Sequence, residues 1–327
     1  MNAPSDQSPI SASSPASESA DFGPAKRGAI ESIRVWTDMI KFAHSVFALP
    51  FAIMATFLAG RSLPGQRPSW LHLVLIVVCM VAARSVAMTF NRIVDARIDA
   101  RNPRTATRPL PAGKLTMLQA WVFLAIFFVT YAIGCFGFYI KFDNPWPMLL
   151  GGPVLMMLCG YSFAKRFTRW SHFWLGCAIG LSPLAAWIAI HPATLGWPAV
   201  LLWVTVMLWM AGFDIIYACQ DIDVDRKEGL FSLPSKIGPG AALMITRVAH
   251  VLVVGLLVLV GKLSGLGWVY FVGVGIVAVL LLIENLSVRP DDFSKVNLAF
   301  FTINGIVSLL LATCTVIDVL MNMPPVL

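Results

Sequence analysis

Charged residues are scarce in this sequence. Asp, Glu, Lys and Arg make up 13% of its 327 residues, about half of the roughly 25% that soluble domains carry. Hydrophobic residues reach 58%, whereas soluble domains have about 45–50% even when glycine is counted. So few charges exclude an ordinary soluble enzyme, a disordered chain and a nucleic-acid-binding protein, despite the formal net charge of +7.

The sequence also lacks the usual signatures of cofactor and metal sites. Its six cysteines form no CxxC pair, its five histidines form no HExxH pattern, and neither a GxGxxG stretch nor a Walker lysine loop occurs. All six cysteines lie in apolar runs. We therefore interpret them as small apolar core residues rather than as disulfides or zinc ligands.

The N-terminal tail has no apolar run either. It is rich in Ser, Pro and Ala, and its first 25 residues contain acids but no arginine. This composition argues against both a secretory signal and a mitochondrial transit peptide, so we expect no cleavable targeting segment. We expect residues 1–30 to form a disordered tail and residues 31–327 to form a single domain.

Long apolar runs dominate the rest of the chain. A helix needs roughly 20 apolar residues to cross the hydrocarbon core of a membrane, and continuous runs of this length exclude the alternation of a membrane β-barrel. We predict an all-α membrane protein with nine transmembrane helices, in the runs 39–59, 70–94, 117–140, 146–163, 171–191, 197–219, 241–260, 267–285 and 296–320.

Basic residues are distributed unevenly about these runs. If the N-terminus is cytoplasmic, nineteen of the 24 Lys and Arg residues lie at cytoplasmic ends and loops, and four lie on the opposite side. Because basic residues concentrate in cytoplasmic loops, we predict a multi-pass protein of the cell (inner) membrane with its N-terminus and charged loops in the cytoplasm.

Two acidic clusters follow apolar runs. Asn91, Asp95 and Asp99 end the second run, at a spacing that places them on one face of a helix. Asp221 and Asp225 follow the sixth run at the same spacing. Because an even number of crossings separates the two runs, both clusters emerge on the same side. The alternative is a pair of solvated loops in which the acids pair with nearby Arg and Lys residues.

The chemistry of these clusters favours a metal–diphosphate site. Carboxylate oxygens at this density suit Mg²⁺, which typically combines one or two carboxylates with substrate phosphates and water. Arg104 and Arg108 follow the first cluster and supply the forked donors that phosphate oxygens prefer. The pattern predicts binding, and ionisation, of a diphosphate at the membrane surface.

Two charged residues lie deeper in the predicted helices. Arg84 and Asp214 each precede their own cluster by seven residues, which places them about 10 Å further into the membrane on the same helix face. Charges inside a membrane are costly and usually functional. We expect both to line a cavity beneath the metal site, where Arg84 can anchor an anionic acceptor. The alternative is an Arg84–Asp214 ion pair that joins two helices.

A third charged loop is predicted on the same side, and it reads YSFAKRFTR from Tyr161. Its basic residues Lys165, Arg166 and Arg169 have two interpretations. They anchor the loop to anionic lipid, or Lys165 helps to hold the diphosphate.

At these motifs the chain resembles the UbiA superfamily of intramembrane prenyltransferases. The resemblance covers about residues 34–320 and rests on NxxxDxxxD at Asn91–Asp99, RTATRPLPAG at Arg104–Gly113, YSFAKRFT at Tyr161–Thr168 and DxxxD at Asp221–Asp225. Within the superfamily the chain is most similar to 4-hydroxybenzoate polyprenyltransferases, because QDIDVDRKEGLFSLPSKIG matches their second motif. The resemblance implies a nine-helix bundle around a central cavity, with cytoplasmic cap loops and a lateral opening to membrane lipid.

The resemblance also implies a role for each matching residue. In that assignment the catalytic Mg²⁺ ligands on the prenyl diphosphate are Asp95, Asp99, Asp221 and Asp225; the diphosphate contacts are Arg104, Arg108 and Lys165; and the acceptor pocket is lined by Arg84, Asn91, Asp214 and Tyr161.

The implied reaction is Mg²⁺-dependent transfer of a polyprenyl chain from its diphosphate to an aromatic acid of the 4-hydroxybenzoate type in quinone biosynthesis. Lys41 departs from the family pattern, because it stands in Ile-Lys-Phe where the family often has Asp-Lys-Pro. This variant resembles a branch that makes menaquinone through futalosine, with 1,4-dihydroxy-6-naphthoate as the acceptor.

Two rival classes fit the sequence less well. A CDP-alcohol phosphotransferase would need an Asp-Gly-x-x-Ala-Arg run, which the sequence lacks. A secondary transporter would place its polar groups near the membrane midplane, whereas the acids here cluster at one surface.

Overall fold

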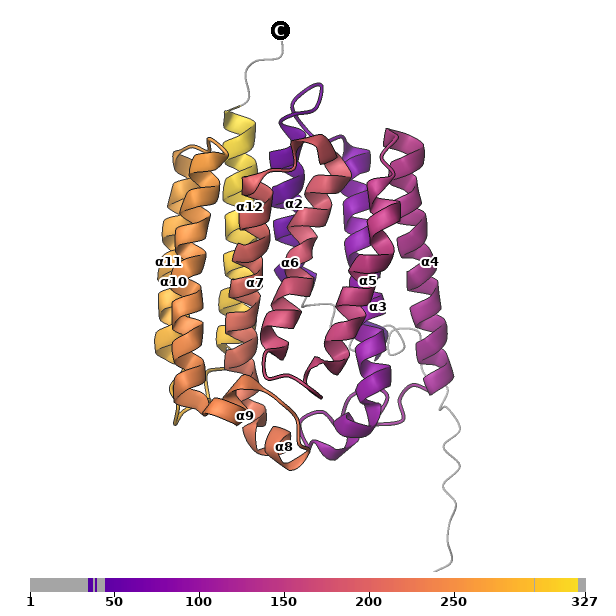
Figure 1. Ribbon diagram of the computed structural model, residues 1–327, viewed down its shortest axis with the longest axis vertical. Coiled ribbons are helices and arrows are strands. Elements are labelled where there is room, and N and C mark those ends of the chain that lie inside the picture. The colour runs from indigo at the N-terminus through magenta and orange to yellow at the C-terminus, as the bar shows by residue number, and fades with distance from the viewer. Residues whose placement is uncertain (1–34, 38, 40–44, 297, 323–327) are drawn as a thin grey trace, which may run out of the picture.

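The computed structural model describes residues 35–37, 39, 45–296 and 298–322, and these form a bundle of helices (Figure 1). The long helices are α2 (Ser45–Gly60), α3 (Trp70–Arg101), α4 (Met117–Phe142), α5 (Trp146–Ala164), α6 (Ser171–Ile190), α7 (Trp197–Ala218), α10 (Pro239–Leu263), α11 (Trp268–Ser287) and α12 (Asn304–Met321). The short elements are η2 (Pro192–Thr194), η3 (Cys219–Asp221), α8 (Ile222–Lys227), α9 (Leu233–Ile237) and the π-helical η4 (Leu298–Ile303).

The predicted all-α membrane architecture is confirmed. Within the described residues, eight helices are long and apolar enough to cross a membrane. The first predicted span corresponds to α2, which has 16 described residues and is therefore a shorter apolar helix. The nine predicted spans thus follow the order of the nine long helices, and the number of helices long enough to cross a membrane is approximately as predicted. The six cysteines are free thiols, as their interpretation as apolar core residues requires.

Helix ends follow from local sequence signals. Ser69 and Thr116 cap α3 and α4 through reciprocal hydrogen bonds with the third helical residue, an arrangement that satisfies otherwise unpaired backbone N–H groups. Proline stands in the first two positions of α5, α7 and α10, where its missing N–H costs nothing. The starts of these five helices are therefore encoded locally.

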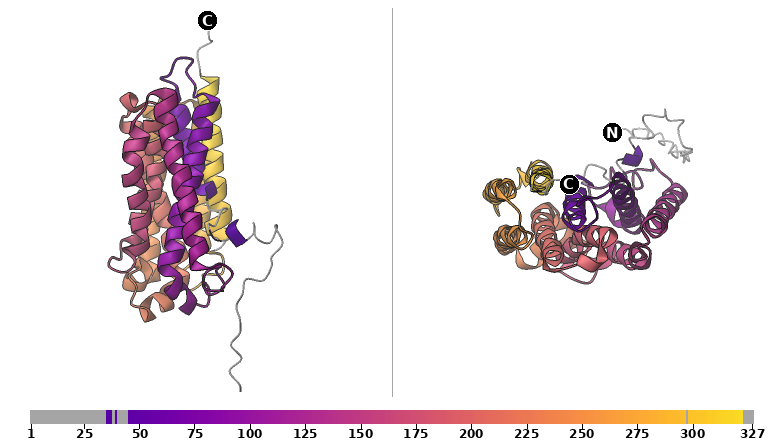
Figure 2. Two further views of the ribbon diagram at one scale, coloured as in Figure 1. Left: turned by 90° about the vertical axis from the view of Figure 1, so that its right-hand side faces the viewer. Right: turned by 90° about the horizontal axis from the view of Figure 1, so that it is seen from above.

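The helices run side by side along one axis of the molecule (Figures 1 and 2). Helix α7 lies between α6 and α10 and packs against both. Gly176 and Gly180 make the α6–α7 contact close, since an added Cβ would lie 2.2 Å from the Met207 carbonyl oxygen and 2.8 Å from the Trp203 carbonyl oxygen. Small residues at helix crossings are the usual means of close packing in membranes.

The helices that carry the two acidic clusters end at other residues than the predicted runs. Helix α3 continues past residue 94 to Arg101, so the whole first acidic cluster stays on one continuous helix. Helix α7 instead ends at Ala218 and gives way to η3 and α8. Asp221 and Asp225 are nevertheless both buried while Asp223 between them is exposed, so the two buried acids share one face, as their spacing predicted.

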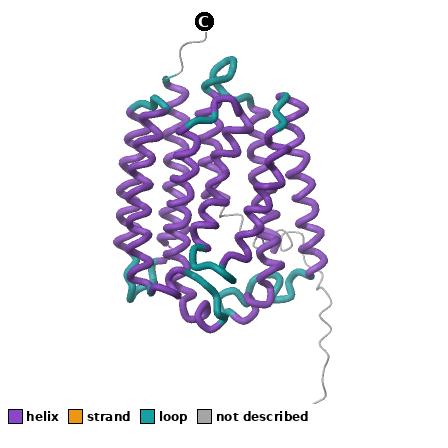
Figure 3. The backbone as a smooth tube through the Cα atoms, viewed as in Figure 1, coloured by secondary structure: helices purple, strands orange, loops and turns teal. Residues whose placement is uncertain are grey.

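Three loops gather at one end of the bundle, which we call the charged end. These loops connect α3 to α4, α5 to α6, and α7 to α10 through α8 and α9, and they lie at the bottom of Figures 1 and 3. The two acidic clusters and the charged loop that begins at Tyr161 all lie on or beside these loops. The chain topology therefore brings them together at one end of the bundle.

Candidate active site

A polar cavity of about 230 Å³ opens at the charged end. It is bounded by α3, the loops of the charged end, α5, α7 and α8. All eleven residues predicted for the site line this one cavity: Arg84, Asn91, Asp95, Asp99, Arg104, Arg108, Tyr161, Lys165, Asp214, Asp221 and Asp225. The structure therefore places these residues together, and their individual roles stay predictions.

The first acidic cluster is held by arginines. Asp99 is buried and accepts hydrogen bonds from Arg108 Nη1 at 2.6 and 2.7 Å, with Arg92 Nη1 3.9 Å from its Oδ2. Asp95 accepts from Asn91 Nδ2 at 2.9 Å and from Arg166 Nη2 at 2.9 Å. Such charge-assisted hydrogen bonds compensate carboxylates that burial would otherwise destabilise.

The second acidic cluster is joined to the first by the loop after α3. Arg104 Nε and Nη2 donate to the two oxygens of Asp221 at 2.9 and 2.5 Å, and its Nη1 donates to the Tyr217 hydroxyl at 2.8 Å. Asn102 Oδ1 accepts from the Arg104 backbone N–H at 2.9 Å, which fixes the turn. Because Arg108 of the same loop pairs with the first cluster, this loop holds the two acidic clusters across the cavity.

Asp225 differs from the other acids. It is buried, and its Oδ2 has no hydrogen-bond partner among the described residues. A buried carboxylate oxygen without a partner is expensive, so this atom is the strongest structural sign that the cavity takes a cation.

The cavity residues fit a divalent cation that shares its coordination with substrate. Within the described part of the chain, no three His, Cys, Asp or Glu side chains are grouped to hold a metal by themselves. Mg²⁺ does not need such a group, because it takes one or two carboxylates and completes its shell with phosphate oxygens and water. The hard oxygen donors that line this cavity are of the type it prefers.

Lys165 lines the polar cavity. Burial alone would lower its pKa, but the carboxylates of Asp225, Asp214 and Asp221 outweigh that effect and raise the pKa above its ordinary value. Its backbone carbonyl accepts from Phe231 N–H at 2.7 Å, which ties the α5–α6 loop to the segment after the second acidic cluster. Arg104 behaves similarly: burial opposes its charge, and the bond to Asp221 raises its pKa.

The alternative of an Arg84–Asp214 ion pair is wrong. Asp214 Oδ2 instead lies 2.6 Å from Nδ1 of His172, and the described residues contain no bridge between Arg84 and Asp214. The Nε of Arg84 is buried without a hydrogen-bond partner in the described chain. Arg84 lines the polar cavity, as does Asp214.

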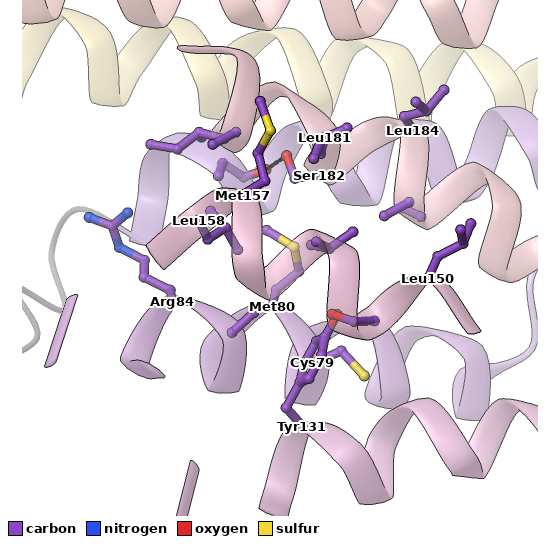
Figure 4. A pocket seen from close by; sticks show the side chains of 18 of the residues that line it. Cys79, Met80, Arg84, Tyr131, Leu150, Met157, Leu158, Leu181, Ser182 and Leu184 are labelled. Carbon is purple, nitrogen blue, oxygen red and sulfur yellow. Dashed lines mark hydrogen bonds between the residues drawn. The ribbon is translucent and has the colours of Figure 1, made fainter. Parts of the chain in front are cut away.

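A second, apolar cavity of about 420 Å³ adjoins the polar one. It lies among α2, α3, α4, α5 and α6, and it follows α6 from Leu175 to Ala189, a distance of about 21 Å along the helix. Figure 4 shows Arg84 at one side of this cavity and Leu150 and Leu184 at the other. The two cavities share five lining residues, which are Arg84, Met88, Tyr161, Leu175 and Ile179. A polar cavity and an apolar cavity therefore lie side by side along α3, α5 and α6.

Five residues that contact the predicted site residues were not predicted as site residues from the sequence. His172, Tyr217, Asn102, Arg92 and Arg166 make direct contacts with predicted site residues. Arg92 lies within the first motif and Asn102 lies three residues after it, while Tyr217 precedes Asp221 by four residues. The position of these three residues beside the motifs was therefore a signal. His172 had none, because its partner Asp214 is 42 residues away in the chain.

The described helices thus enclose a polar cavity beside an apolar one. The UbiA prenyltransferase family matches residues 48–306, and the chain belongs to this family. It is therefore a membrane prenyltransferase, as the sequence motifs predicted.

Relatives and solved structures agree with this assignment. The chain is 29% identical over 249 residues to 4-hydroxybenzoate octaprenyltransferase of Hydrogenovibrio crunogenus, which covers 76% of this chain and 84% of the relative. It is 29% identical over 208 residues, 64% of this chain, to the mitochondrial 4-hydroxybenzoate polyprenyltransferase of Arabidopsis thaliana, and that match spans half of the relative's length.

Two archaeal structures share the fold. A UbiA homologue from Aeropyrum pernix K1 superposes with a TM-score of 0.74 at 28% identity, over 84% of this chain and 98% of the other. A UbiA homologue from Archaeoglobus fulgidus, bound to GPP and Mg²⁺, gives a TM-score of 0.66 at 18% identity over 87% and 99%.

Proposed function

We propose that this protein transfers a polyprenyl chain from its diphosphate to an aromatic acid of the 4-hydroxybenzoate type, in a Mg²⁺-dependent step of quinone biosynthesis. The single observation that carries the proposal is the junction at Arg84 and Tyr161. There, a cavity lined by two acidic clusters and arginines meets a cavity lined almost entirely by apolar side chains.

The donor head fits the polar cavity. Arg104, Arg108 and Lys165 line it and supply the donors for diphosphate oxygens. The four aspartates of the two clusters supply oxygen ligands for the metal. Mg²⁺ bound there would neutralise the diphosphate and stabilise it as a leaving group. Two comparisons support this assignment. The relatives are named 4-hydroxybenzoate octaprenyltransferases and polyprenyltransferases, and the Archaeoglobus fulgidus homologue was solved with bound GPP and Mg²⁺.

The donor tail fits the apolar cavity. Its walls carry small residues such as Ala83 and Ala87 of α3 and Ala178, Ser182 and Ala185 of α6, which leave room between the helices. An apolar channel excludes water that would otherwise quench an allylic cation. The tail thus runs along the bundle from the polar cavity, and longer chains continue into lipid.

The acceptor meets the donor at the junction. Arg84 would bind the acceptor's carboxylate, which orients the ring, while Asn91, Tyr161 and Asp214 line the remaining polar wall. The allylic C–O bond of the donor breaks and its electron pair leaves with the diphosphate. A ring carbon ortho to the phenol then forms the new C–C bond, and the displaced ring proton passes to the released diphosphate or to water.

A second acceptor, 1,4-dihydroxy-6-naphthoate for menaquinone, is suggested by the sequence around Lys41. Lys41 lies outside the described residues, so this alternative rests on the sequence alone. A secondary transporter is disfavoured by the family assignment. The excess of basic residues at the charged end supports a cytoplasmic site and N-terminus in the cell (inner) membrane.

The test is a substrate panel. Purified protein would be incubated with Mg²⁺, with geranyl to nonaprenyl diphosphate as donors, and with 4-hydroxybenzoate or 1,4-dihydroxy-6-naphthoate as acceptors, and the products weighed by mass spectrometry. We expect a prenylated acceptor and pyrophosphate only when Mg²⁺ and both substrates are present. Failure of every pair would contradict the proposal, and a product from the naphthoate alone would select the second acceptor.

A further inference from the structure

His172 connects three elements behind Asp214, which lines the polar cavity. It is the second residue of α6, and its side chain is completely buried. Its Nδ1 lies 2.6 Å from Oδ2 of Asp214 on α7, and its Nε2 accepts the backbone N–H of Leu233 at 3.2 Å. Leu233 begins α9, in the segment that follows the second acidic cluster.

These two contacts define the protonation of the imidazole. Nε2 accepts a hydrogen bond from a backbone N–H, so it carries a lone pair and no proton. The ring proton must then be on Nδ1, where it is donated to Asp214. One oxygen of the Asp214 carboxylate therefore accepts a hydrogen bond from Nδ1–H of His172. The backbone N–H of Leu233 in turn holds the His172 ring in place.

Asp214 is itself a wall residue of the polar cavity. The Asp214 side chain keeps 18% of its exposure and lines the polar cavity, and its hydrogen bond to His172 is the single one that it makes within the described residues. Arg84 lines the same cavity. The cavity thus offers a cation for one end of an aromatic acid and a carboxylate oxygen for a hydroxyl at the other end.

We propose that His172 is a positioning residue for acceptor recognition: it orients Asp214 so that the free carboxylate oxygen accepts the hydrogen bond of the acceptor's phenolic hydroxyl. This inference rests on the proposed function. It adds that the oriented Asp214 carboxylate selects aromatic acids that carry a hydroxyl group. A site built around a hydroxyl rejects an analogue that lacks it, because the carboxylate oxygen would then stay buried and unpaired.

Two conservative variants separate the contacts of His172. In His172→Asn the side-chain amide nitrogen can occupy the place of Nδ1 and donate to Asp214, but the shorter side chain cannot reach Leu233. In His172→Gln the side-chain oxygen can occupy the place of Nε2 and accept from Leu233, but no donor stands where Nδ1 was. A purely structural role predicts similar damage from both.

The experiment measures both KM values and ligand binding for the wild type and the two variants, in full-length detergent-purified protein. The acceptors in the kinetic assay are 4-hydroxybenzoate and 1,4-dihydroxy-6-naphthoate. Binding is measured by thermal shift with these two acids and with their analogues that lack the hydroxyl groups, benzoate and 2-naphthoate. We expect His172→Gln to raise the acceptor KM about tenfold or more, to leave the donor KM within about threefold, and to lose the preference for the hydroxylated probe. We expect His172→Asn to retain that preference.

The outcomes separate the two proposals. If the wild type prenylates neither acceptor and binds no aromatic acid, the proposed function fails. If the wild type is active but both variants keep the preference for the hydroxylated probe, or if both lose it equally, the role of His172 is overturned. A rise in donor KM that matches the rise in acceptor KM would overturn it as well.

Discussion

Arg104 and Asp221 face each other with two hydrogen bonds, of 2.9 and 2.5 Å, although 117 residues separate them in the chain. The pair joins the loop after α3 to the break after α7. Arg108 of the same loop makes the corresponding pair with Asp99. One loop therefore holds both acidic clusters, and its two arginines contact carboxylates that we propose as metal ligands.

Replacement of Arg104 by lysine tests the importance of the forked geometry. Lysine keeps the charge but cannot donate two parallel hydrogen bonds. Loss of one charge-assisted hydrogen bond is worth about 1.5–3 kcal/mol, so we expect Arg104→Lys to raise the donor KM about tenfold or more. The matched control is Arg101→Lys, since Arg101 is largely exposed and pairs with Glu228 away from the polar cavity. Equal effects of the two changes would contradict the assignment.

Asp225 is the acid whose replacement should separate activity from folding. Its Oδ2 lacks a hydrogen-bond partner among the described residues, so Asp225→Asn loses no hydrogen bond at that atom, although it removes one of the carboxylates that support the charge of Lys165. We expect turnover to fall by at least about a hundredfold, as after loss of a group that stabilises charge in the transition state, while the purified protein stays folded in detergent. Asp95→Ala should likewise abolish turnover in a protein that still inserts into membranes. Retention of most activity in either variant would argue against metal binding there.

Arg84 is expected to act on the acceptor rather than on the donor. Its guanidinium stands at the junction of the two cavities, and its Nε has no partner in the described chain. We expect Arg84→Ala to raise the acceptor KM or lower kcat about tenfold or more, in line with the loss of one buried charged contact, and to change the donor KM little. Steady-state kinetics with each substrate varied in turn measures this. An unchanged acceptor KM and kcat would contradict the role.

The apolar cavity should limit the length of donor that is used efficiently. Ala185 lines it and follows Leu184 in the chain, which Figure 4 shows at the side of the cavity opposite Arg84. We expect Ala185→Trp to leave activity with geranyl diphosphate intact and to reduce activity with octaprenyl diphosphate, because the larger ring blocks the space for a long tail. Ile126→Trp on the exposed face of α4 is the control. A uniform loss with donors of every length would indicate misfolding instead of a block.

The pKa of Lys165 predicts a pH effect on stability. The folded protein raises this pKa above the ordinary lysine value through Asp225, Asp214 and Asp221. A group with a raised folded pKa stabilises the fold fully below its unfolded pKa, about 10.4 for lysine, and that contribution is lost as the pH rises through the folded pKa. Melting temperatures of the wild type and Lys165→Arg between pH 7 and 11 should therefore diverge only at the alkaline end, where the wild type loses stability. Parallel curves throughout would refute the assignment.

The sequence predicted the parts of the site that have a local pattern. Asn91, Asp95 and Asp99 follow helical spacing, and parity of the spans brought Asp221 and Asp225 to the same surface. The partners of these groups were not predictable, because they depend on packing between distant helices. His172 is the clearest case: nothing in its neighbourhood indicates Asp214. The sequence could not decide on an Arg84–Asp214 ion pair either. The spacing of the two residues allowed the pair, but α6 packs against α7 and brings His172 to Asp214 instead.

The central claim is that the two acidic clusters share a metal–diphosphate between them. A crystal structure of the protein soaked with Mn²⁺ and geranyl thiodiphosphate, with anomalous data at the Mn edge, tests it most directly. The account predicts anomalous peaks between the α3 carboxylates and the carboxylates of η3 and α8, with the thiodiphosphate bridging them. Metal peaks confined to one cluster, or a diphosphate bound elsewhere, would contradict it.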